Sequence, residues 1–185
     1  MIESDNIYIR ALEKIDAPTI YNFENDPDVW SFGTTFEPLS LDSITKYIER
    51  AQKYDIYVMH QLRLMICRKT DNLSVGCVDI TDFDPHNSRA TLGVMIMKSQ
   101  RNKGYADEAL KLTLTYIFKY LHVNTLYCEI ETTNIPSLNL FKKNGFEVKG
   151  IKEQWVKIDN EYRDVAFLQK MNNRTKNSDN EGQNR

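Results

Sequence analysis

An apolar segment that changes into a helix through a basic, turn-forming loop constrains this chain most. Residues 92–97 (LGVMIM) suit a buried strand, residues 98–103 (KSQRNK) suit a loop, and apolar positions repeat with a helical period from Gly104 onward. That stripe consists of Ala106, Leu110, Leu114, Ile117 and Leu121. A strand that leads through a loop into a helix N-terminus presents free backbone N–H groups and the positive end of the helix dipole. The segment therefore predicts a phosphate-binding site.

The residues of this loop suit contact with a phosphate group. Arg101 and Lys103 carry positive charge. Gly104 allows a ligand to approach the backbone closely, and Ala106 is small. The candidate binding residues are Arg101, Asn102, Lys103, Gly104, Tyr105 and Ala106. On these residues alone, a strand-to-helix turn with solvated basic side chains is an equal alternative, whereas a kinase is disfavoured because the Gly-Lys-Ser/Thr ending of a P-loop is missing.

Strand and helix patterns along the chain predict a mixed α+β fold. Strand patterns and turn residues predict strands at 7–12, on both sides of a turn at 70–72 within 61–81, and at 89–97, 126–131, 146–148 and 164–168. Helical periods, caps and prolines predict helices at 16–25, 40–51, 104–121 and 136–144. A hairpin and meander followed by strand–helix–strand–helix–strand predicts one mixed sheet with helices on both faces.

Size and charge indicate one globular domain without a nucleic-acid partner. The 185 residues are 41% hydrophobic, which suffices for one core and is short for two. We expect a single domain over residues 1–171 and a disordered polar tail over 172–185, where no apolar residue occurs. With 24 Lys and Arg against 26 Asp and Glu, the formal charge is -2, and no long basic run is available to a polyanion.

The first residues and the cysteines favour a cytoplasmic protein. Acidic residues stand where a secretory leader would carry positive charge, and the apolar runs are too short to span a bilayer. Cys67, Cys77 and Cys128 occur singly within apolar segments, which favours buried thiols over a disulfide framework or a zinc site. We therefore expect a cytoplasmic protein with no membrane contact and no metal.

Two motifs in the second half of the chain resemble those of a known enzyme family. The pattern Arg101-x-x-Gly104-x-Ala106 resembles the pyrophosphate-binding motif of the GNAT superfamily of acetyl-CoA-dependent N-acetyltransferases. Residues 134–147 (NIPSLNLFKKNGFE) are similar to that superfamily's N-x-x-S/A-x-x-L-Y/F-x-K-x-G-F signature, at the family's spacing. The likeness spans residues 7–170 and extends to the branch that contains ribosomal-protein N-terminal acetyltransferases and bacterial spermidine acetyltransferases.

The resemblance implies a fold and a place for acetyl-CoA. The family's twisted, mostly antiparallel sheet has one parallel strand pair that splays apart, and the pantetheine arm lies in the opening as an added strand would. The resemblance implies a pyrophosphate site at the 101–106 loop and backbone contacts from Val94, Met95 and Ile96. Further cofactor contacts are implied for Asn134, Ser137, Phe141 and Lys143. Asn134 equally suits a helix N-cap.

The activity implied is direct attack of a primary amine on the acetyl thioester, without a metal. Many family members have a tyrosine at the position of Phe141, where the hydroxyl protonates the leaving thiolate, and phenylalanine has no proton to donate. Ser137 is therefore our candidate catalytic residue at the thiolate, with helix capping or cofactor contact as the alternative. Phe141 also leaves open a non-catalytic acyl-CoA-binding module.

Acidic residues in the connecting segments are candidates for binding a cationic amine. They are Glu24, Asp26, Glu37, Asp79, Asp82 and Asp84. We select Glu37, Asp79 and Asp82 as substrate-binding residues and Asp79 also as a catalytic residue, with solvated loop carboxylates as the alternative. The acceptor is a protein N-terminal amine, a polyamine such as spermidine, or another small amine, and pairing through the last strand leaves a homodimer open.

Overall fold

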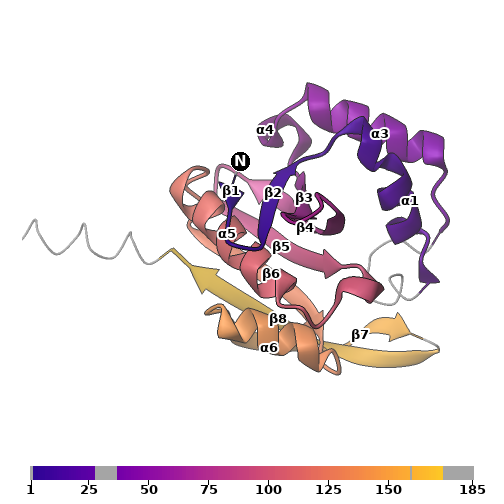
Figure 1. Cartoon of the computed structure of the whole chain (residues 1–185). Helices are drawn as coiled ribbons and strands as arrows, with labels where there is room; N and C mark the ends of the chain where they lie inside the picture. Colours follow the sequence, from indigo (N-terminus) through magenta and orange to yellow (C-terminus); the bar gives the residue numbers. More distant parts are fainter. Residues whose placement is uncertain (1, 28–36, 159, 173–185) are drawn as a thin grey trace, which may run out of the picture.

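An eight-stranded sheet runs through the part of the chain that the structure describes (Figure 1). The computed structural model describes residues 2–27, 37–158 and 160–172. The strands are β1 (Ile2–Glu3), β2 (Ile7–Ala11), β3 (Leu62–Arg68), β4 (Ser74–Asp84), β5 (Arg89–Ile96), β6 (Thr125–Glu131), β7 (Glu147–Ile158) and β8 (Glu161–Met171). Their order is β1-β2-β3-β4-β5-β6-β8-β7. Within the described sheet, β5 and β6 pair in parallel and the other neighbours pair antiparallel, which confirms the predicted mixed α+β class.

Helices pack on both faces of this sheet, as predicted. They are α1 (Ala17–Glu24), α3 (Leu41–Lys53), α4 (Ile56–Met59), α5 (Tyr105–Lys119) and α6 (Ile135–Lys143), with 3-10 turns at Lys14–Asp16 and Lys98–Gln100. Leu110 of α5 and Leu138 of α6 share one core with Ile66 of β3. On the opposite side, α1 and α3 pack over Met65 of β3. Successive residues of β3 therefore point to two different cores, and we call these sides the α5/α6 face and the α1/α3 face.

Local sequence signals set several helix ends. The Ser40 hydroxyl caps α3 by accepting from the backbone N–H of Ser43 at 3.0 Å. Pro136 lies in the first turn of α6, where a missing N–H costs nothing. After α6, Gly145 adopts φ +83°, the left-handed conformation that commonly ends a helix. These ends lie where the capping residues predicted them.

The last hairpin is longer than predicted, and two short elements were missed. Strands were expected at 146–148 and 164–168, but β7 extends to Ile158 and β8 begins at Glu161. The outer half of this hairpin continues past β6 (yellow in Figure 1) and is largely exposed, so no apolar alternation marks it. In addition, β4 continues to Asp84 through an irregularity after Thr81, where a polar connection was expected. Strand β1 and helix α4 are too short to show a repeating pattern of apolar residues in the sequence.

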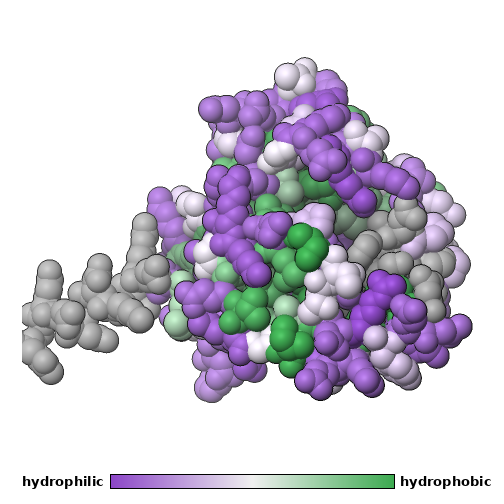
Figure 2. All heavy atoms as spheres, turned by 90° about the horizontal axis from the view of Figure 1, so that it is seen from below, coloured by the Kyte–Doolittle hydropathy of each residue, from purple (hydrophilic) through white to green (hydrophobic). Residues whose placement is uncertain are grey.

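The described residues include three buried thiols, and one face of the molecule is mostly hydrophilic. One face in Figure 2 is mostly hydrophilic, with a small group of hydrophobic residues near its middle. Cys67, Cys77 and Cys128 are buried free thiols, as expected. Among the described residues, no helix combines the length and apolar character needed to cross a membrane.

Removal of residues 173–185 is expected to leave the melting temperature unchanged. Asn172 stays in this variant, and its backbone N–H donates to the Asn124 carbonyl at 2.8 Å. The removed stretch has no apolar side chain whose burial could stabilise the fold, and it lies outside the described residues. Differential scanning calorimetry of both lengths checks this expectation. A loss of several degrees would show that the tail docks on the domain.

Candidate functional site

The parallel strands β5 and β6 pair at one end and separate at the other. Their pairing runs from Arg89 opposite Thr125 to Thr91 opposite Tyr127. Beyond that point β5 continues along β4 up to Ile96, whereas β6 continues along β8. The β5 edge at residues 94–96 therefore faces an opening between the two strands, which we call the wedge. An extended ligand can hydrogen-bond to such an edge as an added strand would, and the predicted splayed pair is confirmed.

The 101–106 loop lies at the end of β5 that borders the wedge. The Arg101 Nε donates to the Ile96 carbonyl at 3.2 Å, which folds the loop back on its strand. The Lys103 ammonium donates to the Gln100 side chain at 2.9 Å, and Asn102 adopts a positive φ of 62°. Two basic residues are thereby kept beside the start of α5, where the helix dipole favours an anion.

Gly104 forms the N-cap of α5 with φ +85°. This left-handed conformation favours glycine, because it costs other residues about 1–2 kcal/mol. Apart from the adjoining backbone and its two neighbouring residues, a Cβ placed on Gly104 would meet no described atom within 4 Å. The first turn that follows, at Tyr105 and Ala106, packs against the core of the α5/α6 face. The helix end is therefore open to a ligand in front of it and supported behind it.

The start of α6 combines an N-cap with a serine whose hydroxyl has no hydrogen-bond partner among the described residues. The Asn134 side chain accepts from the Ser137 backbone N–H at 3.2 Å, so its capping role is present without any ligand. Ser137 is half-buried in the first turn of α6. One turn further, the Phe141 ring is 4% exposed and packs edge-on against Phe146 at 5.0 Å between centroids. The side chain at residue 141 is therefore an apolar packing group that has no proton to donate.

Asp107 joins the two helices that flank the wedge, and sequence reasoning missed it. Its carboxylate accepts from Lys111 on α5 and from Lys143 and Asn144 at the end of α6, at 2.8–2.9 Å. These hydrogen bonds, from Lys111 first and then Lys143, hold the pKa of Asp107 well below its usual range. Lys143, expected to contact the cofactor, thus also links α6 to α5. The sequence feature that could have identified Asp107 is its position as an acidic residue in the first turn of a helix.

On the α1/α3 face, an arginine joins Asp79 to the end of α1. Asp79 on β4 lies opposite Gly93 of β5, so it stands beside the strand that borders the wedge. Its two oxygens accept from Arg63 Nε at 2.6 Å and Arg63 Nη2 at 3.0 Å. The remaining Nη1 of Arg63 donates to Glu24 at 2.5 Å. Glu24 and Asp79 were predicted candidates, but their arginine partner was not.

The other two predicted acceptor residues, Glu37 and Asp82, form no ion pair with Arg63 among the described residues. Asp82 is exposed at an irregular point of β4 with φ +47°, and it accepts from the Thr91 hydroxyl at 3.1 Å. That contact is at the end of the wedge where β5 and β6 still pair. Glu37 is exposed and borders the undescribed residues 28–36. Of the three predicted acceptor residues, Asp79 is therefore the one placed beside the middle of β5.

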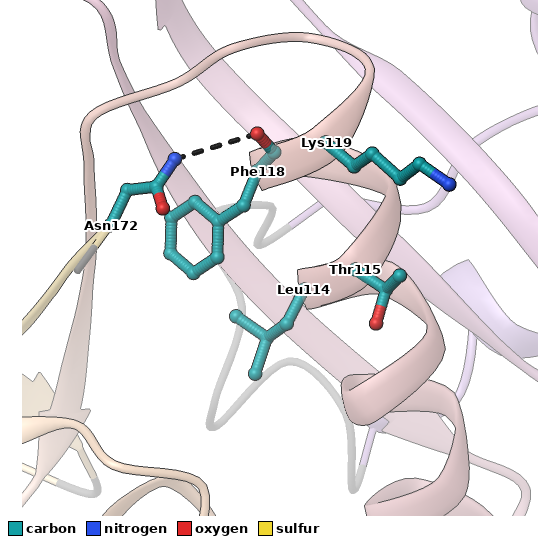
Figure 3. A pocket seen from close by; sticks show the side chains of 5 residues that line it. All are labelled: Leu114, Thr115, Phe118, Lys119 and Asn172. Carbon is teal, nitrogen blue, oxygen red and sulfur yellow. Dashed lines mark hydrogen bonds between the residues drawn. The ribbon is translucent and has the colours of Figure 1, made fainter. Parts of the chain in front are cut away.

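Two cavities in the described part of the chain are lined neither by β5 nor by the 101–106 loop. One of about 220 Å³ is at the C-terminal end of α5 (Figure 3), where the Asn172 side chain donates to the Phe118 carbonyl at 3.4 Å. The other, of about 230 Å³, lies between α3, α4 and β3 and has Arg63 in its lining. The first is at the opposite end of α5 from Gly104, so it has no part in the phosphate site.

Sequence comparison places the chain among acetyltransferases. A family model described as "Acetyltransferase (GNAT) domain" matches residues 6–147. Spermidine N(1)-acetyltransferase of Escherichia coli (strain K12) is 24% identical over 168 residues, which cover 91% of this chain and 87% of that protein. The probable N-acetyltransferase YjcK of Bacillus subtilis (strain 168) is 25% identical, with 93% of this chain and 97% of the relative covered.

Solved structures share the fold over nearly their whole length. Spermidine N-acetyltransferase from Vibrio cholerae, in complex with CoA and spermine, has a TM-score of 0.82 at 20% identity, with 91% of this chain and 96% of that chain covered. A dodecameric structure of the same enzyme gives 0.78 at 21% identity, with coverage of 91% and 95%. An acetyltransferase (GNAT family) from Bacillus anthracis gives 0.77 at 19% identity, with coverage of 92% and 97%.

Proposed function

Because this chain belongs to the GNAT family of acetyltransferases, we propose that the acceptor of this N-acetyltransferase is a primary amine of a polyamine such as spermidine. The observation that carries the proposal is the opening of the β5–β6 pair beside the N-terminus of α5. Spermidine-acetylating relatives that align over most of the chain support the choice of acceptor. Two carboxylates on the α1/α3 face, Glu24 and Asp79, add negative charge that favours a polycation.

Acetyl-CoA is the proposed acetyl donor, with its pantetheine arm in the wedge. Backbone groups of Val94, Met95 and Ile96 would hydrogen-bond to the arm. The pyrophosphate would bind at the start of α5, through Arg101, Asn102, Lys103, Gly104, Tyr105 and Ala106. From the α6 side, the proposed contacts are Asn134, Ser137, Phe141 and Lys143. Reducing conditions in the cytoplasm, our proposed location, suit the free thiols of the chain.

The proposed chemistry begins with removal of a proton from the acceptor. At pH 7 only about one primary alkylamine in a thousand is uncharged, and the protonated form has no lone pair for attack. Asp79 is the proposed base. Both of its oxygens accept from Arg63, and Oδ2 also accepts from the Cys77 thiol at 3.9 Å, so Oδ1 keeps a second acceptor position for an ammonium N–H. Glu37 and Asp82 would attract the cation, and backbone N–H groups on the wedge side of β5 would stabilise the oxyanion.

Ser137→Ala is expected to lower kcat about tenfold or more with little change in acetyl-CoA affinity. The reason is loss of one hydrogen bond to the charged thiolate, worth about 1.5–3 kcal/mol. Adding Phe141→Tyr to this variant should restore part of the rate, because the tyrosine supplies a phenolic proton from the same helix, α6. Steady-state kinetics and calorimetry check both variants. If Ser137→Ala keeps full kcat, the thiolate leaves without a protein hydrogen-bond donor at this position.

A thiol-release assay tests the proposed acceptor directly. Acetyl-CoA is mixed with spermidine, with a peptide that has a free N-terminus, or with a simple monoamine. Faster turnover of spermidine than of either alternative supports the proposal. Preference for the peptide would move the acceptor to protein N-termini. Tight binding of acetyl-CoA without turnover of any amine would instead identify a non-catalytic acyl-CoA-binding module.

A second copy of the chain is the proposed protein partner. The edge strand β7 exposes Ile151 and Trp155, and a spermidine-acetylating relative forms a dodecamer. A homodimer is the smallest assembly that would cover such an edge. Light scattering of the purified protein measures the mass of the assembly.

A further inference from the structure

We propose that Arg63 is a positioning residue for the amine acceptor, which it serves by holding Asp79 beside the wedge and the end of α1 against β3. The inference rests on the proposed function. Arg63 lies on the α1/α3 face, with its side chain 17% exposed. It binds two carboxylates from separate parts of the chain, Glu24 on α1 and Asp79 on β4. A guanidinium is the side chain suited to this arrangement, because its donors lie in one rigid plane.

The contact with Asp79 fixes an orientation as well as a charge. Nε and Nη2 of Arg63 donate to different oxygens of the carboxylate, at 2.6 and 3.0 Å, in the fork arrangement that limits rotation of both groups. Opposite Asp79, Gly93 has no side chain to separate the carboxylate from the backbone of β5. The Asp79 carboxylate is therefore held at a fixed place beside the strand that borders the wedge.

The contact with Glu24 extends this arrangement to α1. Glu24 is the last residue of α1, and the next residue, Asn25, exchanges two hydrogen bonds with the backbone of Leu39 at 2.8 and 3.0 Å. The end of α1 and the residue before Ser40 are thus fixed close to Arg63. Arg63 therefore links the end of α1 and Asp79 of β4 on the same α1/α3 face.

The charges of this cluster favour a cation. One guanidinium and two carboxylates sum to a net charge of about −1 when all three are ionised. The three side chains are 17–27% exposed, so their charges are screened less than those of fully exposed groups. Arg63 thus orders the two acids without cancelling their attraction for an ammonium group.

The same helix carries a second bridge that serves as a matched control. At the start of α1, Arg10 donates through Nη1 and Nη2 to the two oxygens of Asp16, at 2.7 and 2.8 Å. The side chains of Arg10 and Asp16 are 20% and 3% exposed, so this bridge, like the Arg63 cluster, is largely buried. It stabilises α1 and lies on β2, two strands away from β4. A substitution there perturbs the helix without changing Asp79.

The test compares Arg63→Lys with Arg10→Lys in full-length protein, with spermidine and acetyl-CoA as substrates. Lysine keeps the charge but has no planar fork, so it cannot hold both oxygens of Asp79. We expect Arg63→Lys to raise the KM for spermidine about tenfold or more. The KM for acetyl-CoA should stay within about twofold, since the wedge is unchanged. Arg10→Lys should lower the melting temperature without moving either KM.

Glu24→Gln provides a second variant if Arg63→Lys folds poorly. It keeps Arg63 paired with Asp79, and a smaller rise in the spermidine KM is expected. An unchanged KM for spermidine in folded Arg63→Lys overturns the role of Arg63 but not the proposed function. An equal rise of that KM in Arg10→Lys does the same. Failure of the wild-type enzyme to acetylate spermidine overturns the proposed function, and the Arg63 inference with it.

Discussion

Gly104→Trp is expected to weaken acetyl-CoA binding by about 100-fold or more, which corresponds to about 2.7 kcal/mol. Gly104 has φ +85°, and an added Cβ would meet no described atom within 4 Å beyond the adjoining backbone and the two neighbouring residues. We therefore expect the indole to occupy space in front of the α5 N-terminus, where the pyrophosphate is proposed to bind. Isothermal titration calorimetry measures the affinity, and circular dichroism checks that the variant is folded.

Two further glycine variants separate obstruction from backbone strain. Gly104→Ala introduces the strain of a left-handed residue, about 1–2 kcal/mol, with little bulk. Gly150→Trp adds the same bulk on the exposed strand β7, where a Cβ also meets nothing within 4 Å. We expect the first to bind acetyl-CoA with a modest loss and the second to bind normally. Wild-type affinity in folded Gly104→Trp would remove the phosphate site from this loop.

The parts of the fold that follow from nearby residues were predictable. The apolar stripe of α5 and the caps of α3 and α6 each depend on residues within a few turns, so the chain sequence alone reveals them. The outer half of the β7–β8 hairpin was not predictable in this way. Its strands pair with each other beyond the end of β6, so neither face is covered and no alternation arises.

In the site too, the features set by nearby residues were predictable and those set by distant contacts were not. The 101–106 loop is one continuous segment, so its charges and its glycine predict a phosphate site without knowledge of the fold. The Arg63 cluster depends on the register that places Arg63 opposite Asp79 and on a contact with Glu24, 39 residues away. The Asp107–Lys143 bridge spans 36 residues and depends on how α5 meets α6. Such long-range pairs follow from topology, which residue patterns do not encode.

Asp79→Asn is expected to lower kcat/KM for spermidine by about 10²–10⁴ at pH 7, the range typical of a lost general base. The loss should shrink as the pH rises, because the fraction of uncharged amine grows about tenfold per pH unit until it approaches the amine pKa near 10. Acetyl-CoA affinity should not change.

A pH series of initial rates for wild type, Asp79→Asn and Glu24→Gln checks this behaviour. Glu24→Gln removes an equal charge from the same arginine but leaves Asp79 in place, so its smaller loss should be independent of pH. If Asp79→Asn loses activity equally at every pH, Asp79 binds the cation without taking its proton; if it keeps the wild-type rate at pH 7, the base lies elsewhere.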